Sequence, residues 1–238
     1  MRRPTDVALA TLPDAQPVAE DGLPRLIGVT PVAGPLDASR DDPCAITLAL
    51  QAAPDAMVNL ALAAPCNPDQ RVVIRHADLS FTARTDAGGQ LSALLPALQS
   101  PAVVATYLDT NKVVLAEVPV PDLADHLRFA VQLPYPAQFD LTAQAGGQVL
   151  TLGSSRVAQP LLAQVFSAPV TASHPDLTVA LRVTAELCGR TIAAETVLSR
   201  GGSAAHRITD VVIPLCDTSD DILLLKNLAP DLTLATLD

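Results

Sequence analysis

The feature of this sequence that most constrains its fold is a series of short segments in which apolar residues alternate with polar or small ones. Ile46, Leu48 and Leu50 occupy every second position of the first segment, and a second one covers residues 58–62 after a break at Pro54. A period of two residues places one set of side chains on one face of a β-strand. These two segments therefore predict a hairpin-like pair of strands.

Similar segments follow along the rest of the chain, separated by short breaks rich in Gly, Asp, Asn and Pro. They cover residues 71–76, 79–84, 91–95, 103–108, 113–118, 129–133, 139–143, 149–152, 177–183, 192–198, 211–215, 222–228 and 232–235. Many short strands at this spacing indicate a β-sandwich or a barrel. Glycine pairs at 146–147 and 201–202 indicate turns. One helix is expected over residues 156–166, although Pro160 lies in its middle.

The four cysteines fall as one pair in each half of the chain, Cys44 with Cys66 and Cys188 with Cys216. This spacing suits two disulfides better than a metal site or a nucleophile. In the chain-entropy description each bridge contributes about 3 kcal/mol to stability. Disulfides imply an oxidising compartment, so the cysteines favour an exported protein. Such a protein is either periplasmic or anchored to a membrane with its folded part facing the periplasm.

The N-terminal region differs in composition from the rest. Residues 1–40 carry six prolines among Ala, Asp and Glu, without helical or alternating periodicity. This composition is typical of a disordered linker, within which residues 26–32 have the pattern of a strand. The remaining length suffices for two antiparallel β-sandwich domains of the immunoglobulin-like or transthyretin-like kind, over residues 41–135 and 136–238. The chain is thus expected to be all-β.

Composition and charge disfavour two classes of partner. The net charge is −10, from 25 acidic and 15 basic residues, and the chain has no Trp, two Tyr and four Phe. Such a charge repels nucleic acid and anionic lipid, and few aromatic rings are available for stacking on bases. The sequence contains no run of about 18 apolar residues, so it predicts no transmembrane helix. Membrane attachment is therefore expected only through an anchor upstream of the given start.

The start of the chain conflicts with the cysteine argument. The sequence begins Met1-Arg2-Arg3, which resembles the charged start of a signal peptide, but no apolar segment follows. Two expectations follow from this conflict. Either the export signal lies upstream, or the cysteines are reduced in a cytoplasm.

Residues 79–96, LSFTARTDAGGQLSALLP, resemble the strand-turn-strand signature of transthyretin-like and carboxypeptidase-regulatory-type sandwiches. The turn is Thr85-Asp86-Ala87-Gly88-Gly89. Asp86 is expected to accept hydrogen bonds from backbone amides two residues on, and glycine to supply the positive φ that closes the hairpin. A turn role is favoured over a ligand role for Asp86. The motif supports a fold and not an activity.

A wider resemblance covers roughly residues 40–238. It rests on Ala64-Pro65-Cys66, RVVIRH, FTARTDAGGQLSALLPAL, Cys216-Asp217 and LLLKNLAPDL. These elements resemble an uncharacterised bacterial family of envelope proteins, whose members usually carry an N-terminal membrane anchor and a proline-rich linker. The resemblance implies architecture and compartment only. Members sometimes bear the label translocase, which connects to no residue here.

No motif in the sequence predicts a catalytic residue, a metal site or a cofactor. The four histidines are scattered without short His-x-His spacing, and no Gly-x-Ser-x-Gly is present. The acidic run at residues 217–221 lacks the glycine and glutamate of a calcium loop, and is interpreted as a solvated turn.

Three functions remain in competition. The first is a non-enzymatic envelope module that binds or scaffolds a protein partner. The second is a hydrolase whose site is built from loop residues such as His76, Asp78 or His206. The third is a cytoplasmic structural protein with reduced cysteines.

Overall fold

Every strand pairing in the described part of the chain is antiparallel, and the strands form four sheets. The computed structural model describes residues 42–108, 112–144, 146–171, 175–216 and 221–229. No α-helix occurs in these ranges, so the chain is all-β there, as predicted. The expected linker over residues 1–40 and the strand over 232–235 lie outside the described residues.

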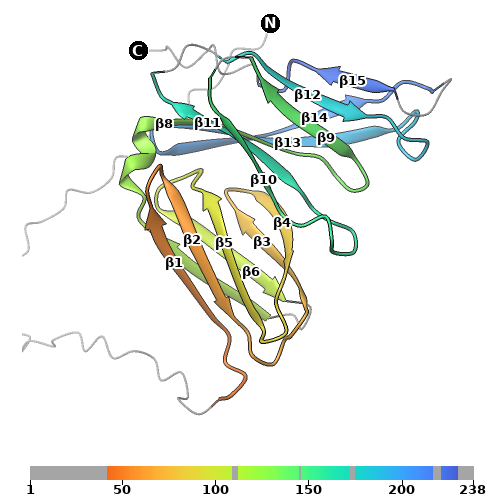
Figure 1. Ribbon diagram of the computed structural model, residues 1–238. Helices are drawn as coiled ribbons and strands as arrows, with labels where there is room; N and C mark the ends of the chain where they lie inside the picture. Colours follow the sequence, from red (N-terminus) through yellow and green to blue (C-terminus); the bar gives the residue numbers. More distant parts are fainter. Residues whose placement is uncertain (1–41, 109–111, 145, 172–174, 217–220, 230–238) are drawn as a thin grey trace, which may run out of the picture. The chain divides into compact units, whose positions relative to one another are not determined.

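The first half of the chain forms two sheets of three and four strands (Figure 1). Their order is β1-β2-β5 and β4-β3-β6-β7. Alternate residues such as Leu60, Leu62 and Ile74 are buried between them. The bounds are β1 Thr47–Ala53, β2 Met57–Ala63, β3 Arg71–His76, β4 Leu79–Arg84, β5 Gln90–Pro96, β6 Ala102–Leu108 and β7 Lys112–Val118.

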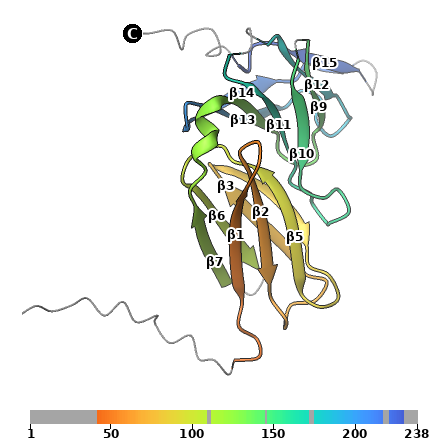
Figure 2. The same cartoon turned by 60° about the vertical axis from the view of Figure 1, so that its left-hand side comes forward.

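The second half forms a five-stranded and a three-stranded sheet around an aliphatic core that includes Phe129, Phe166 and Leu181. The order is β10-β11-β8-β13-β14 and β15-β12-β9. A 3₁₀ helix, η1 (Pro121–Asp125), precedes this half (Figure 2). The bounds are β8 His126–Gln132, β9 Gln138–Ala143, β10 Gln148–Leu152, β11 Ala163–Pro169, β12 Leu177–Arg182, β13 Thr191–Arg200, β14 Ser203–Val212 and β15 Ile222–Leu225.

The expected helix over residues 156–166 is wrong. Its last four residues belong to β11, which lies between β10 and β8 in the five-stranded sheet. Both faces of β11 are covered, so its side chains lack the alternation that identifies a half-buried strand. The residues before β11 form an irregular loop, which contains Pro160 and Gln159, whose φ is 48°.

The two glycine pairs occupy different kinds of connection. Gly201 and Gly202, with φ of 60° and 82°, form the predicted two-residue turn between β13 and β14. Such a turn requires positive φ at both central positions. The pair at 146–147 instead connects β9 with β10, which lie in different sheets and do not pair.

Strand β8 is buried on both faces because it also joins the two halves. Leu127, Phe129 and Val131 pack in the core of the second half. The alternate residue Ala130 packs instead with Leu79 of the first half. The predicted division at residue 135 assigns β8 to the first domain, whereas its hydrogen-bonded neighbours are β11 and β13. Residues 42–238 form one compact unit.

Two threonines in the four-stranded sheet provide a matched pair for testing buried hydroxyl groups. Both are fully buried, but Thr82 Oγ1 accepts a hydrogen bond from the Leu161 amide at 3.1 Å, whereas Thr106 Oγ1 has no partner among the described residues. Burying an unpaired hydroxyl is unfavourable. We expect Thr106→Val to raise the free energy of unfolding by about 1 kcal/mol and Thr82→Val to lower it by about 1–3 kcal/mol. Urea unfolding followed by circular dichroism measures both, and a loss of stability in Thr106→Val contradicts the prediction.

Candidate functional site

The predicted cysteine pairs form two disulfides, Cys44–Cys66 and Cys188–Cys216. The first bridge joins the segments that precede β1 and follow β2, and its Cα atoms are 5.1 Å apart. The second joins the β12–β13 connection to the segment after β14, with a Cα separation of 5.5 Å. Two disulfides indicate an oxidising, extracytoplasmic compartment. Among the described residues no helix is long and apolar enough to cross a membrane.

The Thr85–Gly89 turn connects the two sheets of the first half, and the expectation that it closes a hairpin is wrong. Strand β4 pairs with β3, and β5 pairs with β2. Asp86 Oδ1 accepts hydrogen bonds from the amides of Gly88 and Gln90, both at 2.8 Å. Thr85 Oγ1 donates to the Asn67 carbonyl at 2.6 Å. The side chains of this motif thus hold a connection between layers.

Gly89 is required in this turn for two reasons. Its φ is 74°, which residues with a Cβ rarely adopt. A Cβ at this position would also lie 2.1 Å from the Ala64 carbonyl oxygen. Both observations assign Gly89 to backbone geometry.

His76 is buried, and backbone groups engage both of its ring nitrogens. Nδ1 lies 2.9 Å from the Val103 carbonyl oxygen, and Nε2 lies 2.9 Å from the Leu98 amide nitrogen. Nδ1 therefore donates, and Nε2 accepts from the Leu98 N–H, in a neutral ring. Burial lowers the pKa of His76. His76 and Asp78 line a shallow hollow of about 220 Å³, but this imidazole has no free nitrogen for a substrate.

The lowered pKa of His76 predicts a loss of stability in acid. The unfolded chain binds a proton at the ordinary histidine pKa of about 6.5 and the folded chain does not, so the free energy of unfolding rises with pH. We expect full stability above about pH 6.5 and a loss of up to about 1.4 kcal/mol per pH unit below it. Urea midpoints between pH 7.5 and 5 measure this slope. His76→Gln should abolish it and the exposed His206→Gln should not; an unchanged slope in His76→Gln contradicts the assignment.

Neither His126 nor His206 joins His76 in a site. His206 lies exposed on β14, His126 begins β8, and His174 is outside the described residues. The acidic run at 217–221 is also outside them except for Asp221. Within the described ranges, no group of three or more His, Cys, Asp and Glu side chains is placed to hold a metal.

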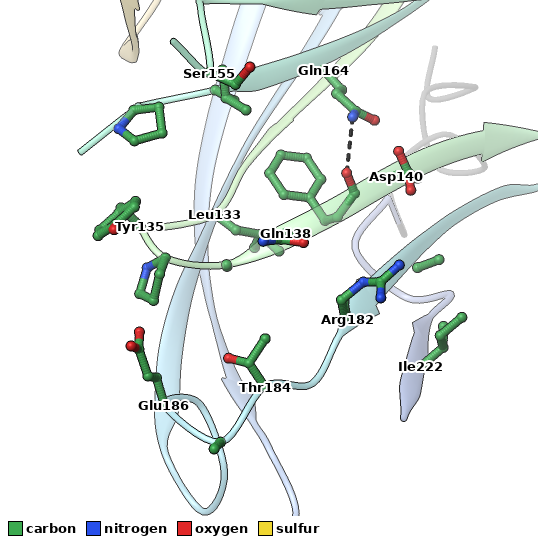
Figure 3. Close-up of a pocket in the computed structure, with 17 residues that line it drawn as sticks. Leu133, Tyr135, Gln138, Asp140, Ser155, Gln164, Arg182, Thr184, Glu186 and Ile222 are labelled. Carbon is green, nitrogen blue, oxygen red and sulfur yellow. Dashed lines mark hydrogen bonds between the residues drawn. The ribbon is translucent and has the colours of Figure 1, made fainter. Parts of the chain in front are cut away.

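An open cleft of about 860 Å³ lies in the second half of the chain. We call it the β9 cleft, and Figure 3 shows its lining side chains. They come from the β8–β9 connection, the outer face of the three-stranded sheet, the loop before β11 and the β12–β13 connection. The lining comprises Leu133, Tyr135, Pro136, Ala137, Gln138, Phe139, Asp140, Ser155, Pro160, Leu162, Gln164, Ala180, Arg182, Thr184, Ala185, Glu186 and Ile222.

Both charged and apolar side chains line the β9 cleft. Asp140 and Arg182 are exposed on neighbouring strands, and Glu186 follows in the next connection (Figure 3). Tyr135 is 53% exposed and Ile222 is 64% exposed. An aromatic ring and an aliphatic side chain beside charges of both signs form a surface suited to peptide side chains.

Gln164 lines this cleft, and its side chain hydrogen-bonds to the backbone of β9. Its Oε1 accepts a hydrogen bond from the Leu141 amide at 2.5 Å. Its Nε2 donates to the Phe139 carbonyl at 3.0 Å, the bond drawn in Figure 3. The side-chain amide thus occupies the position of a neighbouring strand's peptide group. The backbone edge of β9 is therefore protected from strand pairing at these two residues.

Sequence reasoning did not find the β9 cleft. Its lining is spread over residues 133–222 and converges only in the folded chain. The one available signal was Tyr135, one of two tyrosines, next to Pro136 at the expected domain boundary. Comparison with protein-family models and with curated proteins finds no match to this chain.

Proposed function

We propose that this chain is a non-enzymatic binding or scaffolding module of the bacterial cell envelope, acting in the periplasm, and that it holds a segment of a protein partner in the β9 cleft. The observation that carries the proposal is the cleft itself, which presents Tyr135, Ile222 and Arg182 to solvent. Exposed aromatic rings and arginines are enriched at protein interfaces. The sequence resemblance to envelope proteins supports the compartment.

The surrounding structure supports a binding role. The cleft lies on a frame that is fixed by the Cys188–Cys216 bridge and by the Gln164 hydrogen bonds. A site that is held rigid before binding loses less entropy when the partner arrives. The hydrolase hypothesis is weakened at His76, because the protein backbone engages both ring nitrogens.

Site-specific photo-cross-linking tests the proposal. A photoreactive phenylalanine is placed at Tyr135 in the full chain within its native host, and a second chain carries it at Leu94, which is 50% exposed on β5. We expect a discrete protein adduct from position 135 and none from 94. Arg182→Glu in the first chain should abolish the adduct. Equal labelling from both positions, or an adduct that survives Arg182→Glu, contradicts the assigned site.

The compartment is tested separately by intact mass after thiol alkylation without reductant. Four unmodified cysteines in protein isolated from its native host are expected, because both bridges should be formed there. Four alkylated cysteines would instead support a reducing cytoplasm and exclude the periplasmic assignment.

A further inference from the structure

Strand β14 is a long exposed edge of the five-stranded sheet. It pairs with β13 over ten residues, and no other described strand pairs with it. Eight of those ten residues are exposed, including Ile208 at 60% and Val212 at 72%. An exposed edge with apolar residues is a template for pairing with a further strand.

The turn at Gly201-Gly202 determines which backbone groups of β14 face outward. In a two-residue hairpin the flanking residues, here Arg200 and Ser203, exchange both backbone hydrogen bonds. The odd-numbered residues of β14 therefore hydrogen-bond to β13. The N–H and C=O groups of residues 204, 206, 208, 210 and 212 point away from the sheet.

One register of β14 with a second copy of itself satisfies these groups and also places complementary side chains opposite each other. When Ile208 lies opposite Ile208 of an antiparallel copy, His206 lies opposite Asp210 on both sides of the two-fold axis. Ala204 then lies opposite Val212, so apolar residues end the interface. A shift by one hydrogen-bonding step toward the turn places Arg207 opposite Arg207, where like charges repel. A shift the other way places Ile208 opposite Asp210 and His206 opposite Val212, so that apolar residues face polar ones. Of these three registers the side-chain pattern therefore favours the one with Ile208 on the two-fold axis.

We propose that this protein forms a two-fold symmetric dimer through β14, which joins the five-stranded sheets of two copies into one continuous sheet. The partner is a second copy because each residue of the interface meets its complement on the same strand. The inference does not depend on the β9 cleft. If β14 did not pair with a second copy, its charged residues Arg207 and Asp210 would instead protect this edge from pairing with other strands.

Sedimentation equilibrium of the full chain tests the proposal. We expect a mass twice that of the 24.7 kDa chain, and a single-chain mass for Ile208→Lys. Leu94→Lys on β5 is the control and should remain dimeric. Monomeric wild-type protein at concentrations up to hundreds of micromolar, or a dimeric Ile208→Lys variant, overturns the proposal.

Two charge variants test the register itself. His206→Glu, and the double change His206→Lys with Asp210→Lys, each place like charges opposite each other in a homodimer, so each alone should be monomeric. An equimolar mixture places opposite charges together in both pairs and should restore the dimer. Circular dichroism checks that each variant keeps its sheet signal. Folded variants that fail to associate on mixing contradict this register.

A cysteine at the axis gives an independent readout. In a hydrogen-bonded antiparallel pair the Cα atoms are about 5.5 Å apart, which lies within the disulfide range. Ile208→Cys should therefore form a covalent dimer on mild oxidation, and Leu94→Cys should not. All cysteines of the described residues are already paired, so the added thiol would be the free one. Equal cross-linking of both variants indicates random collision and overturns the proposal.

Discussion

Replacing Arg128 by methionine is expected to lower the free energy of unfolding by about 3–5 kcal/mol, because the buried guanidinium donates hydrogen bonds from the second half of the protein to three carbonyl groups of the first. Arg128 lies on β8 and is 1% exposed. Its Nη1 donates to the carbonyl oxygens of Ala56 at 2.7 Å and Ala97 at 2.5 Å, and its Nη2 donates to that of Asp55 at 2.5 Å. Methionine fills part of the volume but removes the donor from all three carbonyl groups, of which only that of Ala56 keeps a backbone partner, the Ala97 amide at 3.0 Å.

Burial and two nearby carboxylates act on the charge of Arg128 in opposite directions. Burial lowers the pKa of Arg128 to about 10, while the nearby carboxylates of Asp122 and Asp55 act in the opposite direction. The side chain therefore stays charged at neutral pH, and Asp122 also accepts a hydrogen bond from the Ala56 amide at 2.8 Å. Each unpaired buried carbonyl costs about 1–3 kcal/mol, so the loss of several contacts is large.

Urea unfolding followed by far-UV circular dichroism measures the effect of Arg128→Met. Arg75→Met is the matched control, because Arg75 is exposed on β3, and it should change stability by less than about 0.5 kcal/mol. Arg128→Lys should be intermediate, since an ammonium group lacks the planar fork that reaches several carbonyls. A loss below about 1 kcal/mol in Arg128→Met would show that the connection between the halves rests on apolar packing instead.

Sequence alternation located most of the strands because most of them are half-buried. Strands β3 and β4 have the predicted bounds, and β1 and β2 form the predicted hairpin. Strand β11 was mistaken for a helix because both of its faces are covered. Most of β14 was missed for the opposite reason, since neither of its faces is covered along residues 203–208. Periodicity reports a difference between two faces, and these two strands have none.

The hydrogen bonds of Arg128 between the two halves could not be predicted, and neither could the β9 cleft, because both depend on contacts between distant segments. Arg128 bonds to carbonyl groups that lie 31 to 73 residues away in the sequence. A single arginine inside the apolar run of residues 127–133 was the available signal, since an unpaired charge is rarely buried there. Gln132 is a second case, because its amide exchanges hydrogen bonds with the Ser80 backbone. The sequence identifies such residues as unusual but not their partners.

Removing the Cys188–Cys216 bridge by the double change Cys188→Ala and Cys216→Ala is expected to lower the free energy of unfolding by about 3–4 kcal/mol. The two cysteines are 28 residues apart, and without the bridge the unfolded chain regains the freedom of that loop. The bridge is also half-buried and packs against the core of the second half, so alanine loses apolar contacts as well. The lost loop constraint and the lost apolar contacts both lower the free energy of unfolding.

The Cys44–Cys66 bridge provides the comparison. Its cysteines are 22 residues apart, so the chain-entropy contribution is nearly the same, about 3 kcal/mol. Cys66 is exposed, however, and neither cysteine packs against a core cluster. We therefore expect Cys44→Ala with Cys66→Ala to cost less than the other double change, and mild reductant to open this bridge first because its sulfur is accessible to an attacking thiolate. Urea midpoints of both double variants, with timed alkylation of the wild type in reductant, measure the two effects. Equal stability losses and simultaneous reduction would show that packing around Cys188 and Cys216 contributes nothing beyond the loop constraint.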